Sequence, residues 1–232
     1  TKINTFLSQL LTEKTIESSY QSSIATIWKD RVAKHQEYTA QIPFSDFKVF
    51  DFICQNVPKN SQLQVSNSSA IRYLQLFDLD KSIQVFCNRG TSGIDGSTST
   101  AIGAALATNL PTILITGDIS FLYDSNALWN NYIPKNFKII LLNNSGGGIF
   151  RILPGHQETE TFNRYFETSH QLNASHLAKM YGFDYFEAND EATLQQQYKS
   201  FLNQNEKPSI LEIFTPEKEN NGILLEFFRG LK

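Results

Sequence analysis

The fold of this chain of 232 residues is indicated most clearly by two stretches, Thr112-Ile-Leu-Ile-Thr-Gly-Asp-Ile-Ser120 and Lys138-Ile-Ile-Leu-Leu-Asn-Asn-Ser-Gly-Gly-Gly148. Each contains a short, continuous run of aliphatic and β-branched residues, followed by glycine and polar residues. Continuous apolar runs of this length are typical of strands that are buried on both faces of a parallel sheet. We therefore predict two such strands, 112–116 and 138–142, each followed directly by a polar loop.

Further strands and helices alternate around these two strands. The predicted strands are 63–65, 83–86, 112–116, 138–142 and 209–214, and the predicted helices are 45–58, 68–76, 98–107, 125–131, 175–181 and 190–203. Such alternation is typical of βαβ units. The predicted fold class is α/β, with a doubly wound, mainly parallel sheet and helices on both faces, and its ligands should lie beyond the carboxyl ends of the strands.

The first 44 residues differ from the rest. They contain no glycine, and Ile24, Ile27, Trp28 and Val32 recur at the spacing of an amphipathic helix. We predict that residues 1–44 are a connector or the tail of a preceding domain and that 45–232 form the α/β domain. Because the chain begins with Thr and its only methionine is Met180, we expect it to be part of a longer protein.

Composition argues against several classes of function. The net charge of −3 disfavours a nucleic-acid binder driven by bulk electrostatics, and no apolar run approaches the roughly 18 residues of a membrane span. The two cysteines and four histidines show no metal-binding spacing, and no signal peptide is visible. We expect a cytoplasmic protein with no nucleic-acid partner and no membrane span.

The distribution of glycine predicts that the middle of the chain forms the functional site. Nine of the twelve glycines lie between Gly90 and Gly155, and glycine permits a close approach of the backbone to a ligand. The loop Asn88-Arg-Gly-Thr-Ser-Gly-Ile-Asp-Gly96 leads into a predicted helix, whose N-terminus favours an anion. A tight turn without chemical role is the alternative.

Two further loops follow the predicted strands 112–116 and 138–142. Asp118 stands where a Mg²⁺ ligand is common, although it could instead cap the next helix. Asn143 and Asn144 precede three glycines, so that side-chain and backbone oxygens could reach one cation, although a plain glycine-rich turn is also consistent. The chain between Asp118 and Asn144 is long enough for one helix and one return strand, so the two side chains should come from adjacent strands and meet.

A Gly-Asp pair followed at this distance by Asn-Asn resembles the fingerprint of the thiamine-diphosphate-dependent enzymes, and the resemblance implies their cofactor-binding fold for residues 45–232. It implies that Asp118, Asn144 and the carbonyl of Gly146 bind Mg²⁺, or Mn²⁺ in its place, and that the cation holds the diphosphate of thiamine diphosphate. The family's usual Gly-Asp-Gly reads Gly117-Asp118-Ile119 here, a departure shared by some branches.

The three motifs together are most similar to one branch of that family, the carboligases that join 2-oxoglutarate to isochorismate with loss of CO₂ in menaquinone biosynthesis. Both substrates are dicarboxylates, and arginine binds carboxylates through two parallel hydrogen bonds. The resemblance assigns this role to Arg89 and Arg72, with Ser68 as a further polar contact. Surface salt bridges are the alternative for both arginines.

The resemblance also gives roles to the remaining motif residues. Ile94 would separate the two rings of the cofactor, Ser92 and Gly93 would lie near its aminopyrimidine, and Ser120 would contact the diphosphate. Ile149 and Phe150 would form an apolar wall beside the reacting carbon, unless they are ordinary core residues. Taken together, the cofactor contacts are predicted at Ser92, Gly93, Ile94, Gly117, Asp118, Ile119, Ser120, Asn144 and Gly146. Residues 151–170 are expected to be either a lid or a surface loop.

In the family, the glutamate that activates the cofactor lies on an amino-terminal domain, and nothing in this sequence resembles that domain. We therefore expect this carboxyl-terminal part to be inactive by itself, and the full-length protein to be a homodimer or homotetramer. Two other interpretations stay open, an acetohydroxyacid-synthase-like carboligase and a non-catalytic module that binds Mg²⁺ and diphosphate.

Overall fold

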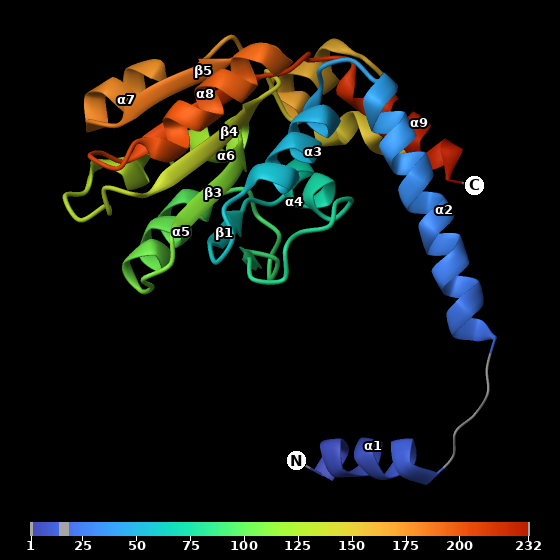
Figure 1. Cartoon of the computed structure of the whole chain (residues 1–232). Coiled ribbons are helices and arrows are strands. Elements are labelled where there is room, and N and C mark those ends of the chain that lie inside the picture. The colour runs from blue at the N-terminus through green and yellow to red at the C-terminus, as the bar shows by residue number, and fades with distance from the viewer. Residues whose placement is uncertain (1, 14–18, 232) are drawn as a thin grey trace.

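The computed structural model describes residues 2–13 and 19–231 and is built on one sheet of six parallel strands (Figure 1). The order of the strands is β2-β1-β3-β4-β6-β5. Their bounds are β1 Gln62–Val65, β2 Gln84–Cys87, β3 Thr112–Gly117, β4 Lys138–Asn143, β5 Asp184–Ala188 and β6 Ser209–Phe214. The predicted doubly wound α/β class is confirmed, and the strand order reverses between β1 and β3, where such sheets bind ligands.

Helices cover both faces of the sheet, as the strand pattern requires. The face with Ile113 and Ile115 packs against α3 (Asp46–Asn56), α4 (Ser69–Leu74), α8 (Glu191–Asn203) and α9 (Asn220–Gly230). The opposite face, with Leu114, packs against α5 (Ser97–Leu106), α6 (Asp118–Tyr123), the 3₁₀-helix η1 (Ser125–Trp129) and α7 (Ser175–Tyr181). Because side chains alternate along a strand, a strand between two helical layers is buried on both faces and is apolar at most positions.

Several elements differ from the sequence-based prediction. The segment predicted as a helix at 125–131 is a short 3₁₀-helix, and the first helix after β3 is α6, which begins at Asp118 itself. Strand β5 and helix α9 were not predicted. Strand β5 is only half-buried at the edge of the sheet, so it lacks the apolar run that identifies the central strands.

The N-terminal part contains α1 (Lys2–Glu13) and α2 (Tyr20–Gln41). The last turns of α2 pack on the α/β domain, where Tyr38 Oη donates to the carbonyl of Ile223 at 2.6 Å. The earlier apolar residues of the predicted stripe, Ile24, Ile27 and Trp28, are exposed. No helix in the described ranges is long and apolar enough to cross a membrane.

Candidate functional site

A cavity of about 420 Å³ opens where β1, β3 and β4 end. Strands β3 and β4 pair in a register that places Gly117 beside Leu142, so Asp118 and Asn143 leave the sheet at the same level. Strand β1 lies on the other side of β3 and delivers Asn67 and Ser68 to the same edge. The loops after three strands thus meet at the point where the order of the strands reverses.

Twelve of the fourteen residues predicted for the site line this cavity. They are Ser68, Ser92, Gly93, Ile94, Gly117, Asp118, Ile119, Ser120, Asn144, Gly146, Ile149 and Phe150. Arg72 and Arg89 are not among the lining residues, and both side chains are exposed. The fold therefore brings together the residues predicted for the cofactor and leaves the two predicted substrate arginines outside the cavity wall.

Asp118 joins the loops that follow β3 and β4. Its Oδ2 accepts a hydrogen bond from the backbone N–H of Gly146 at 2.9 Å, and its Oδ1 accepts one from the N–H of Ile119 at 2.7 Å. The side chain is buried. One buried carboxylate therefore lies in direct contact with the glycine whose carbonyl is predicted as a cation ligand.

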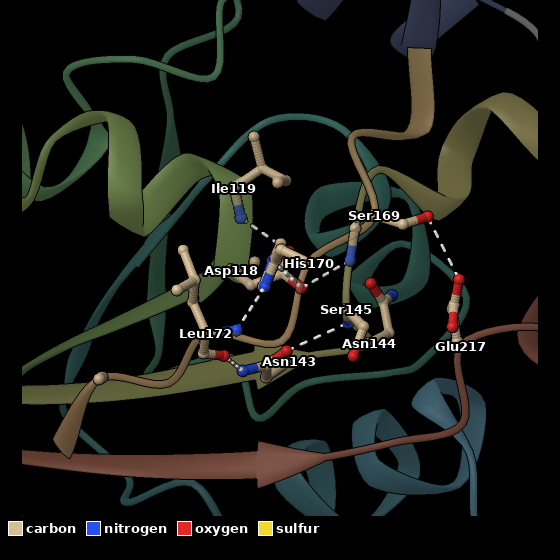
Figure 2. A network of polar contacts seen from close by, with 12 residues as sticks. Asp118, Ile119, Asn143, Asn144, Ser145, Ser169, His170, Leu172 and Glu217 are labelled. Atoms are coloured by element: carbon tan, nitrogen blue, oxygen red, sulfur yellow. Dashed lines mark hydrogen bonds and ion pairs between the residues drawn. The ribbon is translucent and has the colours of Figure 1, made fainter. Parts of the chain in front are cut away.

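His170 lies beside this carboxylate (Figure 2), with Nε2 3.3 Å from Asp118 Oδ2. Its backbone N–H donates to the carbonyl of Ser145 at 3.1 Å, and its Nδ1 accepts from the N–H of Leu172. The contact with Asp118 raises the pKa of His170 above its ordinary value, against the opposing effect of burial. Its spacing along the chain gives no reason to predict His170 as a site residue, because only the fold brings it close to Asp118.

Asn144 is held by a residue that the sequence did not indicate. Its Nδ2 donates to Asp46 Oδ2 at 2.9 Å, and Asp46 Oδ1 accepts from Thr215 Oγ1 at 2.6 Å. Burial raises the pKa of Asp46 to about 6, the two hydrogen bonds oppose this shift, and the charge of Asp118 adds to it. At the start of α3, Asp46 has the sequence signature of an ordinary first-turn acidic residue.

Backbone strain is concentrated in the loops around the cavity. Ser68, Ser92 and Ser145 have positive φ angles of 74°, 59° and 63°, although none is a glycine. Each follows a different strand, β1, β2 or β4. Conformations of this kind cost about 1–3 kcal/mol each and persist where the surrounding structure enforces them, often at binding sites.

Each of the two arginines predicted to bind substrate forms a hydrogen bond with a residue of the cavity wall. Arg72 Nη1 donates to the carbonyl of Ser68 at 2.8 Å, and Arg89 Nη1 donates to Asn67 Oδ1 at 3.3 Å. Asn67 also donates through Nδ2 to the carbonyl of Gly93 at 2.6 Å. Neither arginine forms a salt bridge with a described residue, so the structure does not support the alternative of surface salt bridges.

Ser120 differs from its predicted role in one respect. Its hydroxyl lines the cavity but donates to the carbonyl of Ile94 at 2.5 Å. That bond ties the loop after β2 to the start of α6, across 26 residues of chain. In the structure, Ser120 therefore positions Ile94 at the cavity wall.

The outer wall of the cavity comes from the segment predicted as a lid or a surface loop. The 3₁₀-helix η2 (Gly148–Ile152), which leads into this segment, contacts the π-helix η3 (Phe162–Glu167) inside it, and Phe150 and Phe166 pack edge to face with centroids 5.9 Å apart. Arg151, which is 2% exposed, forms ion pairs with Glu167 and Glu158. Residues 165–168 line the cavity, so this segment is part of the site.

The charged side chains that line the cavity are all acidic. Among the described residues that line it, Asp46, Asp118 and Glu167 carry carboxylates, and there is no lysine or arginine. No group of three His, Cys, Asp or Glu side chains in the described ranges is arranged to hold a metal ion. Any cation here would depend on a mixed set of carboxylate, amide and carbonyl oxygens, which is the set that Mg²⁺ prefers.

Comparison with known proteins gives matches over most of the chain. The family described as "Thiamine pyrophosphate enzyme, C-terminal TPP binding domain" matches residues 67–213. Proteins named 2-succinyl-5-enolpyruvyl-6-hydroxy-3-cyclohexene-1-carboxylate synthase are 61% identical in Flavobacterium johnsoniae, over 98% of this chain, and 65% identical in Flavobacterium psychrophilum, over 93%. A protein of the same name from Bacteroides fragilis is 41% identical over 83% of the chain. The matches span only 41%, 39% and 35% of the lengths of these three relatives.

Proposed function

This chain belongs to the thiamine pyrophosphate enzymes, whose C-terminal TPP binding domain it contains, and from that premise we propose that its cavity holds Mg²⁺ and the diphosphate of thiamine diphosphate. Asp118, Asn144 and the carbonyl of Gly146 would be the cation ligands, and Mn²⁺ would serve in place of Mg²⁺. The hydrogen bond from the Gly146 N–H to Asp118 supports this set, because it holds the carboxylate next to the residue that carries the proposed carbonyl ligand.

The observation that carries the proposal is the charge of the cavity wall. A diphosphate is strongly anionic, and the described wall offers Asp46, Asp118 and Glu167 but no lysine or arginine. Glu167 is already paired with Arg151 behind the wall, so Asp46 and Asp118 are the carboxylates that no lysine or arginine compensates. Burying an anion beside carboxylates is costly unless a cation compensates the charge. A divalent cation bound by oxygen ligands would neutralise Asp118 and the diphosphate together, so the residues present fit the cation and the cofactor only as a pair.

The remaining lining residues fit the rest of the cofactor. We assign Ser92, Gly93 and Ile94 to its rings and Gly117, Ile119 and Ser120 to the neighbourhood of the diphosphate. Ser120 would act mainly through Ile94, whose carbonyl it holds. When bound, thiamine diphosphate supplies a nucleophilic carbon that permits a 2-oxo acid to lose CO₂ and form a new carbon–carbon bond.

For the whole protein we propose a transferase of menaquinone biosynthesis that joins 2-oxoglutarate to isochorismate, which is the activity of the branch with these motifs. Support comes from the 61% and 65% identities to proteins named as the corresponding synthase. Ser68, Arg72 and Arg89 would bind substrate carboxylates at the rim, because each arginine is already bonded to a wall residue. Ile149 and Phe150 would exclude water from the reacting centre.

The proposal extends to parts outside this chain. The activating glutamate would come from a preceding domain, and the full-length protein would be a homodimer or homotetramer. Residues 1–44 would connect the domains. A cytoplasmic location is consistent with Cys54 and Cys87, which are both free thiols.

Calorimetric titration of the full-length protein with thiamine diphosphate, with and without Mg²⁺, tests the cofactor assignment. We expect binding that requires Mg²⁺. Binding that is equal without a divalent cation would contradict the assignment, and binding without any turnover would indicate a non-catalytic module.

Replacement of Arg89 tests the substrate assignment. Arg89→Ala should raise the KM for the dicarboxylates at least about tenfold, because a charged hydrogen bond to a carboxylate is worth about 1.5–3 kcal/mol. Arg229→Ala is a matched control, since Arg229 is exposed on α9 and does not line the cavity. An enzyme of the acetohydroxyacid-synthase type would instead accept pyruvate and tolerate the loss of Arg89.

A further inference from the structure

At the cavity, Asp46 connects its own helix α3 to three other parts of the chain. Its Oδ2 accepts from Asn144 after β4, its Oδ1 accepts from Thr215 after β6, and its backbone N–H donates to Asn220 Oδ1 at the start of α9 at 2.8 Å. The residue itself begins α3, is only 3% exposed and lines the cavity. Both carboxylate oxygens are thus engaged by partners within the protein.

The hydrogen bond between Asp46 and Asn144 determines which way the amide points. An asparagine amide has one oxygen, which can bind a cation, and one nitrogen, which can only donate. An ionised carboxylate only accepts, so the group that faces Asp46 is the NH₂. Asn144 Oδ1 is left on the other side of the amide, where it accepts no hydrogen bond from the described part of the chain.

We propose that Asp46 is a positioning residue that fixes the Asn144 amide with its oxygen available to the cation and thereby sets the cation affinity of the site. This inference rests on the proposed function, because it presumes that Asn144 is a ligand. Asp46 acts only through Asn144 and is itself not a ligand, since Thr215 and Asn144 occupy its two oxygens.

The hydrogen bonds that Asp46 receives and donates restrict its own position, and a restricted carboxylate can orient the Asn144 amide. Thr215 and Asn220 belong to the segment that leaves β6, and Asn220 Nδ2 donates to the carbonyl of Pro216 at 2.8 Å. Asp46 is therefore held through its carboxylate by Thr215 after β6 and through its backbone by Asn220 on α9. Groups that orient a metal ligand in this manner typically change metal affinity about 10–100-fold when they are replaced.

The test measures Mn²⁺ binding to the full-length protein in the presence of saturating thiamine diphosphate. The electron paramagnetic resonance signal of free Mn²⁺ reports how much of the ion remains unbound. Asp46→Asn should weaken Mn²⁺ binding at least about tenfold, because an amide in place of the carboxylate no longer selects one orientation of Asn144. Asp51→Asn is the matched control. Asp51 lies on the same helix, bonds to Gln55 and does not line the cavity, so Mn²⁺ binding should be unchanged.

A double-mutant cycle separates positioning from general damage to the fold. Asn144→Ala should weaken Mn²⁺ binding, and adding Asp46→Asn to it should have no further effect, because the amide that Asp46 orients is then gone. Additive losses would overturn the inference, and so would an Asp46→Asn protein that binds Mn²⁺ within twofold of wild type. A wild-type protein that binds no Mn²⁺ with the cofactor present would instead refute the proposed function itself.

A second variant keeps the test decisive if Asp46→Asn does not fold. Thr215→Val removes the hydrogen bond to Asp46 Oδ1 while leaving the carboxylate and Asn144 in place. It should weaken Mn²⁺ binding by less than Asp46→Asn does, because the carboxylate is then braced from one side only. Unchanged Mn²⁺ binding in a folded Thr215→Val protein would overturn the inference.

Discussion

At the scale of single residues, Gly146 is the point where the predicted cation loop meets the segment that covers it. Its φ is 154°, and a Cβ atom built there would lie 2.8 Å from the carbonyl oxygen of Glu167. Both observations require glycine, because the backbone conformation disfavours a side chain and the neighbouring atom belongs to the backbone.

Gly146→Ala should destabilise the protein by about 1–3 kcal/mol, through backbone strain and the displacement of Glu167. Gly103→Ala is the matched control, because Gly103 lies within α5 and an added Cβ would meet no atom within 4 Å. That control should raise the stability by up to about 1 kcal/mol, as alanine does within helices. Urea unfolding of both variants measures the difference, and equal effects would contradict the role given to Gly146.

Asp46 should make stability depend on pH. Its pKa is about 6 in the folded protein against an ordinary 3.8, so the folded state binds the proton more tightly between these values. The contribution of Asp46 to stability should therefore fall as the pH rises through this window, by on the order of 3 kcal/mol. The measurement is the difference in unfolding free energy between wild type and Asp46→Asn, without divalent cations. A difference that stays constant from about pH 4 to about pH 8 would contradict it.

At the scale of elements, Arg151 links the two helical segments that form the outer wall of the cavity. It lies on η2, and its ion pairs reach Glu167 at the end of η3 and Glu158 before it. Arg151 and Glu167 are 2% and 1% exposed. A buried pair of this kind is costly to break from one side, because the remaining charge stays in a low-dielectric environment.

Arg151→Met should destabilise the protein by about 3–5 kcal/mol, since it leaves Glu167 buried without a cationic partner. Lys34→Met is the control, because Lys34 pairs with Asp30 on the exposed surface of α2, and its loss should cost at most about 0.5 kcal/mol. Unfolding in urea compares the two variants. Similar small losses would indicate that the pair between Arg151 and Glu167 does not hold the wall in place.

For the whole molecule, the main observation is that the chain corresponds to only part of its relatives. It spans 41% of the length of its relative from Flavobacterium johnsoniae. If the activating glutamate lies on a preceding domain, as proposed, residues 1–232 by themselves should show no turnover and should bind thiamine diphosphate more weakly than the full-length protein. Assaying both proteins with 2-oxoglutarate and isochorismate measures this. Product formed by residues 1–232 would contradict it.

Much of the fold could be predicted because its signals are local. The strands at 112–116 and 138–142 contain consecutive apolar residues at 113–115 and 139–142, and Ser45 caps α3 as expected. Elements with weaker local signals were missed, such as the half-buried edge strand β5, or were assigned the wrong type, such as the 3₁₀-helix η1. Their conformation depends more on packing against the rest of the chain than on their own pattern.

The amino-acid pattern alone shows which loops carry glycine and polar residues and that these loops follow parallel strands, because apolar periodicity and turn chemistry are properties of neighbouring residues. Which distant side chains reach those loops is visible only in the folded chain. Asp46 meets Asn144 across 98 positions and Thr215 across 169, and His170 meets Asp118. Those contacts follow from the order of the strands and the packing of α3 and α9 against the sheet, which no local pattern specifies.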